Sequence, residues 1–281
     1  MEIQHLTITA RRDSRLPLFP DEARYRAAIR RLGRVVGRAA ARVGLALFAL
    51  VDEHLHLLGC GTRAAVARLG HAVRCSLKNL VATPLERPYH RDVTNRWHLK
   101  KLLEYFLDQP RHHGLPFGMH HGLFVGSCLP DLLGARRVDG LRLCISRVLP
   151  RYQPAMALEM ARLPTAPLVP ADDGTLRRLG AAGIVAASSA AFASPPDLGG
   201  KSPPVVRARR VAVKLARAAG LCTANLAVAL CMTPRAVQRL AVGPTDSDDL
   251  LVVRRRIALE VRARVAPAPR VDVSLQRRRR G

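Results

Sequence analysis

Two histidines inside an apolar stretch are the first candidates for chemistry in this chain. His54 and His56 flank Leu55, and apolar runs lie on either side of them at residues 45–51 and 57–58. In an extended strand successive side chains alternate between faces, so both imidazoles would project to one side while Leu55 faces the core. Two imidazoles placed in this way can share one divalent metal, which predicts a metal site on this strand.

A tyrosine about fifty residues later is the second candidate. Apolar side chains recur at helical spacing between residues 99 and 107 and define a buried stripe. Tyr105 lies off that stripe, and Gln109 follows it by one helical turn. We therefore expect a phenol and an amide to point the same way from one helix. The stripe consists of Leu99, Leu102, Leu103, Phe106 and Leu107.

These residues resemble the motifs of a known family, the single-strand-specific tyrosine transposases of the HUH superfamily, which include the REP-associated tyrosine transposases. One match is the histidine pair after a hydrophobic strand. The other is Tyr105, three intervening residues, then Gln109 and Pro110. The resemblance covers residues 1–145, about half of the chain. The second match continues through Arg111, Gly114 and Leu115, and a looser likeness runs from Gly126 and Ser127 to Leu133 and Gly134.

The resemblance implies a metal-dependent transposase that cleaves and rejoins single-stranded DNA at hairpins or repeat ends. Tyr105 would be the catalytic nucleophile, forming a 5′-phosphotyrosine and a free 3′ hydroxyl, so that joining needs no ATP. A phenol with a pKa of about 10 is a poor nucleophile at neutral pH. His54, His56 and Gln109 would therefore hold Mg²⁺ or Mn²⁺ to polarise the scissile phosphate. Relatives act as monomers or as homodimers that exchange the tyrosine.

The elements that must position these residues predict an α+β fold over residues 1–150. Residues 3–10 alternate as a strand, and residues 21–42 predict a basic amphipathic helix. A hairpin is expected from residues 45–51 and 54–59, followed by a helix at residues 62–81. This order favours an antiparallel sheet with helices on one face, and the ferredoxin-like fold of the family fits it.

Composition points to a polyanionic partner. The chain has 46 lysines and arginines against 21 acidic residues, a formal net charge of +25. Nucleic acid is the most common polyanion bound by proteins, although an arginine bias also reflects GC-rich coding. In the first half, Arg11, Arg12 and Lys101 are the expected DNA contacts. Six cysteines without a C-x-x-C pair, no signal sequence and no apolar run of membrane-spanning length predict a cytoplasmic protein without a membrane partner.

The second half predicts a separate DNA-binding unit. Residues 151–204 are rich in proline and alanine and predict a linker. Residues 205–265 contain a helix-turn-helix pattern in which Thr233 caps a second helix that begins at Pro234. Residues 266–281 predict a basic tail that contacts phosphates. On the second helix three exposed polar side chains suit base edges in a major groove of duplex DNA: Arg235, Gln238 and Arg239.

Several alternatives stay open at this stage. The turn Val51-Asp52-Glu53 differs from the usual family sequence, which keeps alive a cleavage-inactive, transposase-derived protein that binds specific DNA sequences. A plasmid or phage replication initiator would use the same nicking chemistry. The helix-turn-helix could be an ordinary helical hairpin with a solvated basic face. A different metal site could form from His112, His113, His120 and His121.

Overall fold

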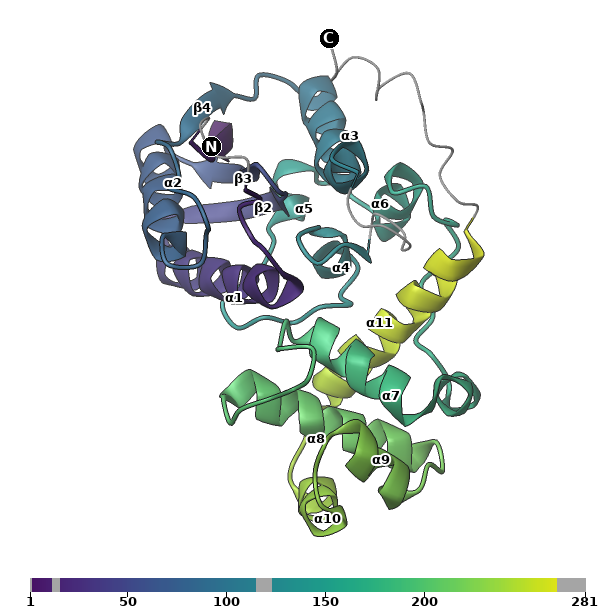
Figure 1. The fold of residues 1–281 in the computed structure, drawn as a ribbon. Coiled ribbons are helices and arrows are strands. Elements are labelled where there is room, and N and C mark those ends of the chain that lie inside the picture. The colour runs from purple at the N-terminus through teal and green to yellow at the C-terminus, as the bar shows by residue number, and fades with distance from the viewer. Residues whose placement is uncertain (1, 12–15, 115–122, 267–281) are drawn as a thin grey trace.

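The computed structural model describes residues 2–11, 16–114 and 123–266 of the 281-residue chain. Its strands are β1 (Glu2–Thr9), β2 (Val43–Leu50), β3 (His54–Gly61) and β4 (Tyr89–Asp92). The helices of the first half are α1 (Glu22–Ala39), α2 (Arg63–Leu77), α3 (Arg96–His112), α4 (Leu129–Leu132), α5 (Ile145–Val148) and α6 (Pro154–Met160). The second half consists of α7 (Asp173–Ala191), α8 (Pro203–Ala218), α9 (Thr223–Ala229), α10 (Pro234–Val242) and α11 (Ser247–Val265) (Figure 1).

The first half is built on a four-stranded antiparallel sheet in the order β2-β3-β1-β4. The predicted hairpin corresponds to β2 and β3, which turn at Asp52 and Glu53, and the predicted first strand corresponds to β1. The two predicted helices are present as α1 and α2, although α2 ends at Leu77 instead of residue 81. Each has a side-chain cap at its first turn, from Asp21 for α1 and Thr62 for α2.

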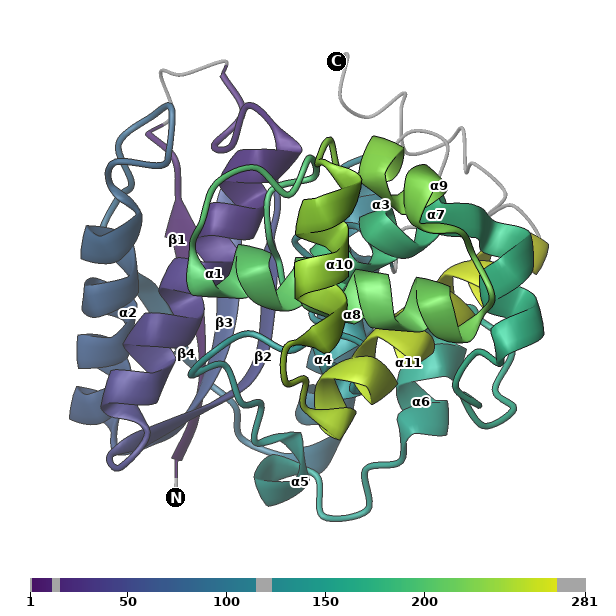
Figure 2. The ribbon, with the colours of Figure 1, turned by 90° about the horizontal axis from the view of Figure 1, so that it is seen from below.

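Helices cover both faces of this sheet, so the expectation of helices on one face is wrong. α1 and α2 lie side by side on the face that carries Leu6 (Figure 2), where α2 approaches so closely that a Cβ at Gly70 would come within 2.6 Å of Leu6. α3 lies on the opposite face, where Phe106 packs against His56. The physical reason is that β2 is apolar along nearly its whole length, and a strand of that kind needs cover on both sides.

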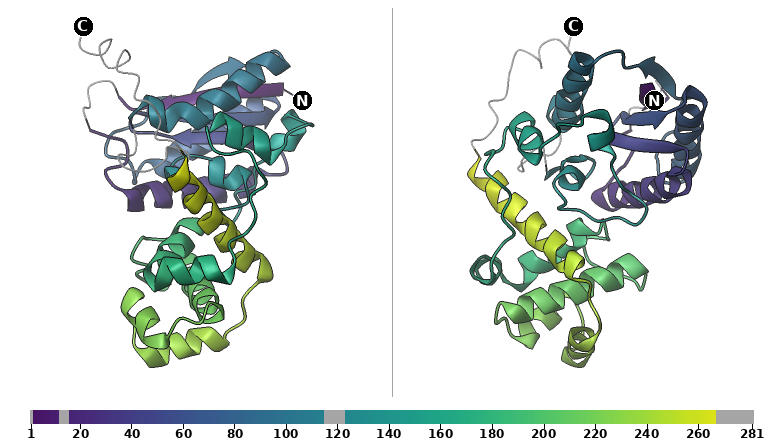
Figure 3. Two further views of the ribbon diagram at one scale, coloured as in Figure 1. Left: turned by 90° about the vertical axis from the view of Figure 1, so that its right-hand side faces the viewer. Right: turned by 180° about the vertical axis from the view of Figure 1, so that it is seen from behind.

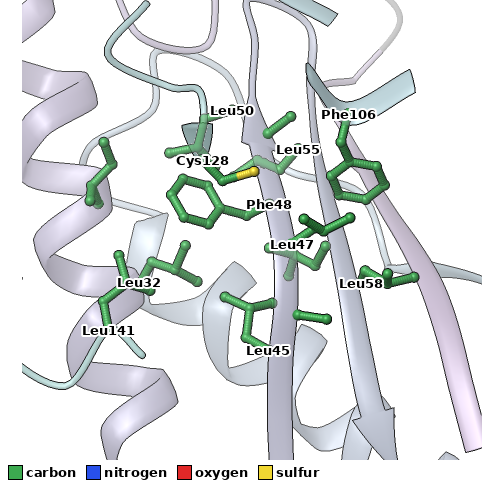
Figure 4. Close-up of a cluster of buried hydrophobic side chains, with 14 of the residues drawn as sticks. Leu32, Leu45, Leu47, Phe48, Leu50, Leu55, Leu58, Phe106, Cys128 and Leu141 are labelled. Atoms are coloured by element: carbon green, nitrogen blue, oxygen red, sulfur yellow. The ribbon is translucent and has the colours of Figure 1, made fainter. Parts of the chain in front are cut away.

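The main core fills the space between the sheet and its helices. Phe48 of β2 packs near Leu32 of α1 and Cys128, while Phe106 of α3 covers the other side of the hairpin near Leu58 (Figure 4). All five of these side chains are fully or almost fully buried. This packing fixes where β3 and α3 lie relative to each other, because both contribute large apolar groups to the same cluster.

The range expected to be a linker contains folded structure. Residues 151–204 include α6 and α7, which is interrupted by a kink at Gly180, and α7 packs along α8 around a second apolar core. The prediction failed because a helix rich in alanine and glycine buries small side chains and shows little periodic contrast between its faces. The helical region thus begins at α7 and not at residue 205.

The two halves are joined by more than the chain connection. α11 starts in the helical region and runs toward the sheet (Figure 3), where Leu259 and Ala263 enter the main core. Arg137 lies 2.9 Å from Asp246 and 2.8 Å from Asp249, which adds a polar bridge between the halves. In the described part of the chain no helix has the length and apolar character needed to cross a membrane.

Candidate active site on the face shared by β3 and α3

β3 presents both predicted histidines to α3. Its register with β1 pairs His56 with Thr7, and its alternation sends Leu55 to the face covered by α2. His56 is only 3 % exposed, while His54 nearer the turn is partly exposed. The prediction that the two imidazoles share one side is confirmed, but His56 is buried rather than displayed on an open surface.

α3 supplies the predicted tyrosine and amide. The helix begins after Asn95, whose side chain accepts a hydrogen bond from the backbone N–H of His98 at 2.8 Å. All five residues of the predicted apolar stripe are buried. Gln109 is only 1 % exposed because this flank of α3 faces β3, whereas Tyr105 remains 42 % exposed. The two side chains therefore point the same way, toward the histidines.

Two short contacts join the helix to the strand. The Tyr105 hydroxyl lies 3.3 Å from Nε2 of His56, and Oε1 of Gln109 lies 3.3 Å from Nε2 of His54. The His54 and His56 rings meet edge to face, with centroids 4.4 Å apart. All four residues proposed from the sequence for the catalytic and metal site thus meet at one place.

A second layer of polar groups, which was not predicted from the sequence, contacts His56 on the side away from Tyr105. Nδ1 of His56 lies 2.9 Å from Nε2 of His5 and 3.3 Å from the Thr7 hydroxyl. Both partners come from β1, which the register places beside β3. When His56 carries its proton on Nδ1, it donates to one of these partners and keeps the Nε2 lone pair free toward Tyr105. The alternating polar positions of β1 were the only sequence signal for this layer.

The turn before β3 is also part of the site. Nδ1 of His113, at the end of α3, lies 2.6 Å from Oδ1 of Asp52, and the His113 ring packs edge to face on His54 with centroids 4.9 Å apart. Of the four histidines considered for a separate metal site, His113 thus belongs to this one and His112 is exposed. His120 and His121 lie outside the described residues.

Burial sets the protonation of the site. Burial, followed by repulsion from His54 and His5, lowers the pKa of His56 to about 2, and burial lowers the pKa of His5 to about 4. The pKa of His54 is lowered for the same reason. Burial works against ionisation of Asp52, but its contact with His113 outweighs that effect and its pKa is lowered. Near neutral pH the imidazoles of His5, His54 and His56 are therefore neutral, with available lone pairs.

Tyr105 is not activated by this environment alone. Burial raises the pKa of its phenol, and a hydrogen bond with Gln109 offsets only part of that increase. The hydroxyl is therefore protonated at neutral pH. A reaction at Tyr105 needs help at the electrophile that it attacks.

The donor set of the site fits a divalent metal. Among the described residues, no group of three or more His, Cys, Asp and Glu side chains could hold a metal ion. A metal at His54 and His56 would therefore draw on the Gln109 amide oxygen as well. Two neutral imidazole nitrogens and one amide oxygen form a mixed set of the kind that Mn²⁺ accepts. The contacts of His56 with His5 and Thr7 are the outer partners that a ligating histidine usually has.

Exposed aromatic and basic side chains continue the site toward the edge strand. Tyr89 of β4 pairs in register with Thr7, which itself pairs with His56, so all three share one face of the sheet. Tyr89 is 69 % exposed, as is Trp97 at the start of α3. Arg91 and Arg96 beside them are also exposed. This surface was not among the sites predicted from the sequence.

The predicted DNA contacts are spread over the molecule. Arg11 is exposed just after β1, and Arg12 lies outside the described residues. Lys101 is exposed on α3 with Nζ 2.9 Å from a carboxylate oxygen of Glu104. The three polar residues predicted for groove reading are exposed on α10, remote from this site (Figure 1). The predicted basic tail falls almost wholly outside the described residues.

Comparisons of the chain with protein-family models, with curated proteins and with solved structures find no match.

Proposed function

We propose that this protein cleaves and rejoins single-stranded DNA through a covalent phosphotyrosine at Tyr105. The observation that carries the proposal is the meeting of Tyr105 and Gln109 from α3 with His54 and His56 from β3. A nucleophile beside a set of neutral metal ligands, at a half-exposed position, is an arrangement suited to metal-assisted phosphodiester transfer. The contacts join two elements that lie about fifty residues apart in sequence.

The topology supports the same proposal. The strand order β2-β3-β1-β4, with α1 and α2 on one face, supports the ferredoxin-like fold that the resemblance to HUH tyrosine transposases implies. In this interpretation α3 is an additional helix that brings the tyrosine to the open face of the sheet. Function is still argued from the site, because one fold carries many activities.

The exposed aromatics favour a single strand over a duplex at this site. Unpaired bases offer flat faces that stack on tyrosine and tryptophan, while arginines contact the backbone. Tyr89 lies two strands across from His56 on the same face, a separation of about 10 Å at the usual strand spacing. A base stacked on Tyr89 would leave a neighbouring phosphate near Tyr105.

In the proposed reaction the Tyr105 oxygen bonds to phosphorus while the bond from phosphorus to the 3′ oxygen breaks. The phenol proton leaves to solvent, which reaches this half-exposed side chain, and the departing 3′ oxygen takes a proton from water. Rejoining reverses the step when a 3′ hydroxyl attacks the phosphotyrosine. His54, His56 and Gln109 would hold a divalent metal, and Mn²⁺ suits this donor set. When bound, the metal supplies Lewis-acid polarisation of the phosphate.

A labelled-hairpin assay tests the proposal. The purified full chain is incubated with Mn²⁺ and a single-stranded hairpin labelled at either end, and the products are separated on a denaturing gel. We expect the 3′-labelled strand to shift to the mass of the protein and the 5′-labelled strand to yield a shorter fragment with a free 3′ hydroxyl. Tyr105→Phe should abolish the shift, because only the nucleophilic oxygen is removed.

Tyr89→Phe is the matched control, since it removes a hydroxyl from another exposed tyrosine on the same face. It should keep the adduct. An adduct of undiminished yield in Tyr105→Phe would refute the assignment of the nucleophile. If the unmodified chain forms no adduct, the cleavage proposal fails and the alternative of a cleavage-inactive DNA-binding protein is favoured.

A further inference from the structure

The structure contains a second surface suited to nucleic acid, at the end of the molecule opposite α3 and β4 (Figures 1 and 3). α9 and α10 are joined by the four-residue turn 230–233, in which Cys231 adopts a left-handed backbone conformation with φ of 50°. Both helices pack against α8. The apolar side chains that hold this arrangement together are Leu226, Ala227, Leu230 and Val237.

α10 packs on the protein through one face and exposes the opposite face to solvent. Val237 is its only buried residue, and the Thr233 hydroxyl caps its start by accepting from the backbone N–H of Ala236 at 3.3 Å. Arg235, Gln238 and Arg239 are all exposed, at spacings of three and four residues, so they share one face of the helix. Val242 is 86 % exposed at its end. A short helix anchored on one side has its polar face free to enter a groove.

Charge favours a polyanion at this surface. Residues 203–265 contain twelve arginines and lysines against four acidic residues, and α9 and α10 contain no acidic residue. Two of the three acids that follow α10 are engaged elsewhere: Asp246 contacts Arg137, and Asp249 contacts both Arg137 and Arg207. They therefore do not neutralise the two arginines of α10.

The residue types favour duplex DNA over a single strand. Residues 193–281 contain no phenylalanine, tyrosine or tryptophan, so this region lacks the stacking side chains that single-strand binders use. Arginine pairs with guanine and glutamine with adenine in the major groove, and an exposed valine can contact a thymine methyl. A helix also fits the major groove of DNA, whereas the corresponding groove of duplex RNA is too narrow to be read.

We propose that α10 is the recognition helix of a sequence-specific duplex DNA site, with Arg235, Gln238 and Arg239 reading base edges. The site goes beyond strand cleavage and does not depend on it. Because α11 packs its far end into the main core, a duplex on α10 would be held at a fixed orientation to the face that carries Tyr105. The protein would thus locate a double-stranded sequence and act on a single strand nearby.

The test uses the full chain in a Tyr105→Phe background, so that no covalent adduct contributes to binding. The probe is a pool of 30-base-pair duplexes with a randomised centre, from which bound sequences are selected, and affinity is then measured at several salt concentrations. We expect a selected sequence, and a loss of about tenfold or more in affinity for each arginine removed in Arg235→Ala/Arg239→Ala. The salt dependence should also become less steep.

Two controls separate recognition from charge and from folding. Arg34→Ala/Arg38→Ala removes two exposed arginines with the same spacing from α1 and should change affinity less than threefold. Arg235→Lys/Arg239→Lys keeps the charge but loses the bidentate geometry, so it should keep non-specific binding and lose the selected sequence. Circular dichroism and an unchanged unfolding midpoint show that each variant is folded.

The proposal is overturned if the α1 variant loses as much affinity as the α10 variant, or if no sequence is selected. The proposal is also overturned if Arg235→Ala/Arg239→Ala loses as much affinity for single-stranded oligonucleotides of the selected sequence as it loses for the duplex. Failure of the Tyr105 adduct assay leaves it intact, since no arm of this test uses cleavage.

Discussion

The site around His56 and the exposed face of α10 both gather polar side chains, but they hold them in opposite ways. Around His56, groups from β1, β3 and α3 contact one another and are largely buried. On α10, Arg235, Gln238 and Arg239 come from one helix and are exposed. Chemistry at a phosphate needs groups fixed in advance, whereas groove reading needs groups that reach outward from a firm support.

The two regions also differ in their content of aromatic residues. The exposed Tyr89, Trp97 and Tyr105 all lie on β4 or α3, and residues 193–281 contain no aromatic ring of the Phe, Tyr or Trp type. Stacking surface is therefore confined to the half with the candidate nucleophile. This contrast is the reason for assigning single strands to one region and duplexes to the other.

We expect the largest difference between the regions in the free energy of unfolding when an aspartate replaces an apolar residue. Leu55→Asp places an unpaired charge in the main core, where the native side chain is fully buried, and should cost about 4 kcal/mol or more. Val242→Asp on α10 should change stability by less than about 0.5 kcal/mol, since that side chain is exposed. Urea unfolding of both variants measures the effect. Equal destabilisation would show that α10 is covered in solution.

Replacing His54 or His56 should reduce cleavage much more than it reduces the stability of the fold. His54→Ala and His56→Ala are expected to lower Mn²⁺-dependent cleavage about 100-fold or more, because Lewis-acid assistance is worth several kcal/mol. His56→Ala should also destabilise by about 1–3 kcal/mol, since it leaves the partly buried His5 without its partner. His54→Ala should destabilise less, because His54 is partly exposed.

Cleavage rates and thermal unfolding of these two variants together test the assignment. Binding of the selected duplex should be unchanged in both, because α10 lies at the other end of the molecule. Normal cleavage in both variants would remove the metal site from the proposal.

A smaller effect on activity is expected when Tyr89, one of the exposed aromatic residues proposed to stack on bases, is replaced. Tyr89→Ala should raise KM for a single-stranded hairpin by roughly 5-fold to 100-fold, the range for loss of one stacked base, with kcat little changed. Tyr89→Phe should restore KM, because the ring and not the hydroxyl makes the contact. Steady-state kinetics measures both. A fall in kcat with KM unchanged would assign Tyr89 to the reaction and not to substrate binding.

The two regions are not independent folding units, despite this contrast. Leu259 and Ala263 of α11 belong to the main core, and the Arg26 guanidinium of α1 donates to the backbone carbonyl of Ser194 at 2.6 Å. Removing the second half would therefore expose part of the first. Point variants of the full chain are for this reason the appropriate tests, in place of truncation between residues 151 and 204.

Local periodicity alone was enough to predict much of the fold. Alternation identified β1, the turn at Asp52 and Glu53 marked the start of β3, and the recurring leucines of α3 placed Tyr105 and Gln109 off the buried stripe. The cap at Thr233 and the proline after it marked the start of α10. These features depend on neighbours within a few residues, so a single sequence contains them in full.

Contacts between distant segments could not be obtained in that way. The register that sets Thr7 beside His56, the approach of His113 to Asp52 and the burial of His56 all depend on how β1, β3 and α3 pack together. Likewise α7, whose small residues give little contrast between faces, is recognisable as a helix through its packing on α8. The sequence determined which residues could do chemistry, and the tertiary structure decided which of them meet, because side chains from separate elements are brought together only by a shared core.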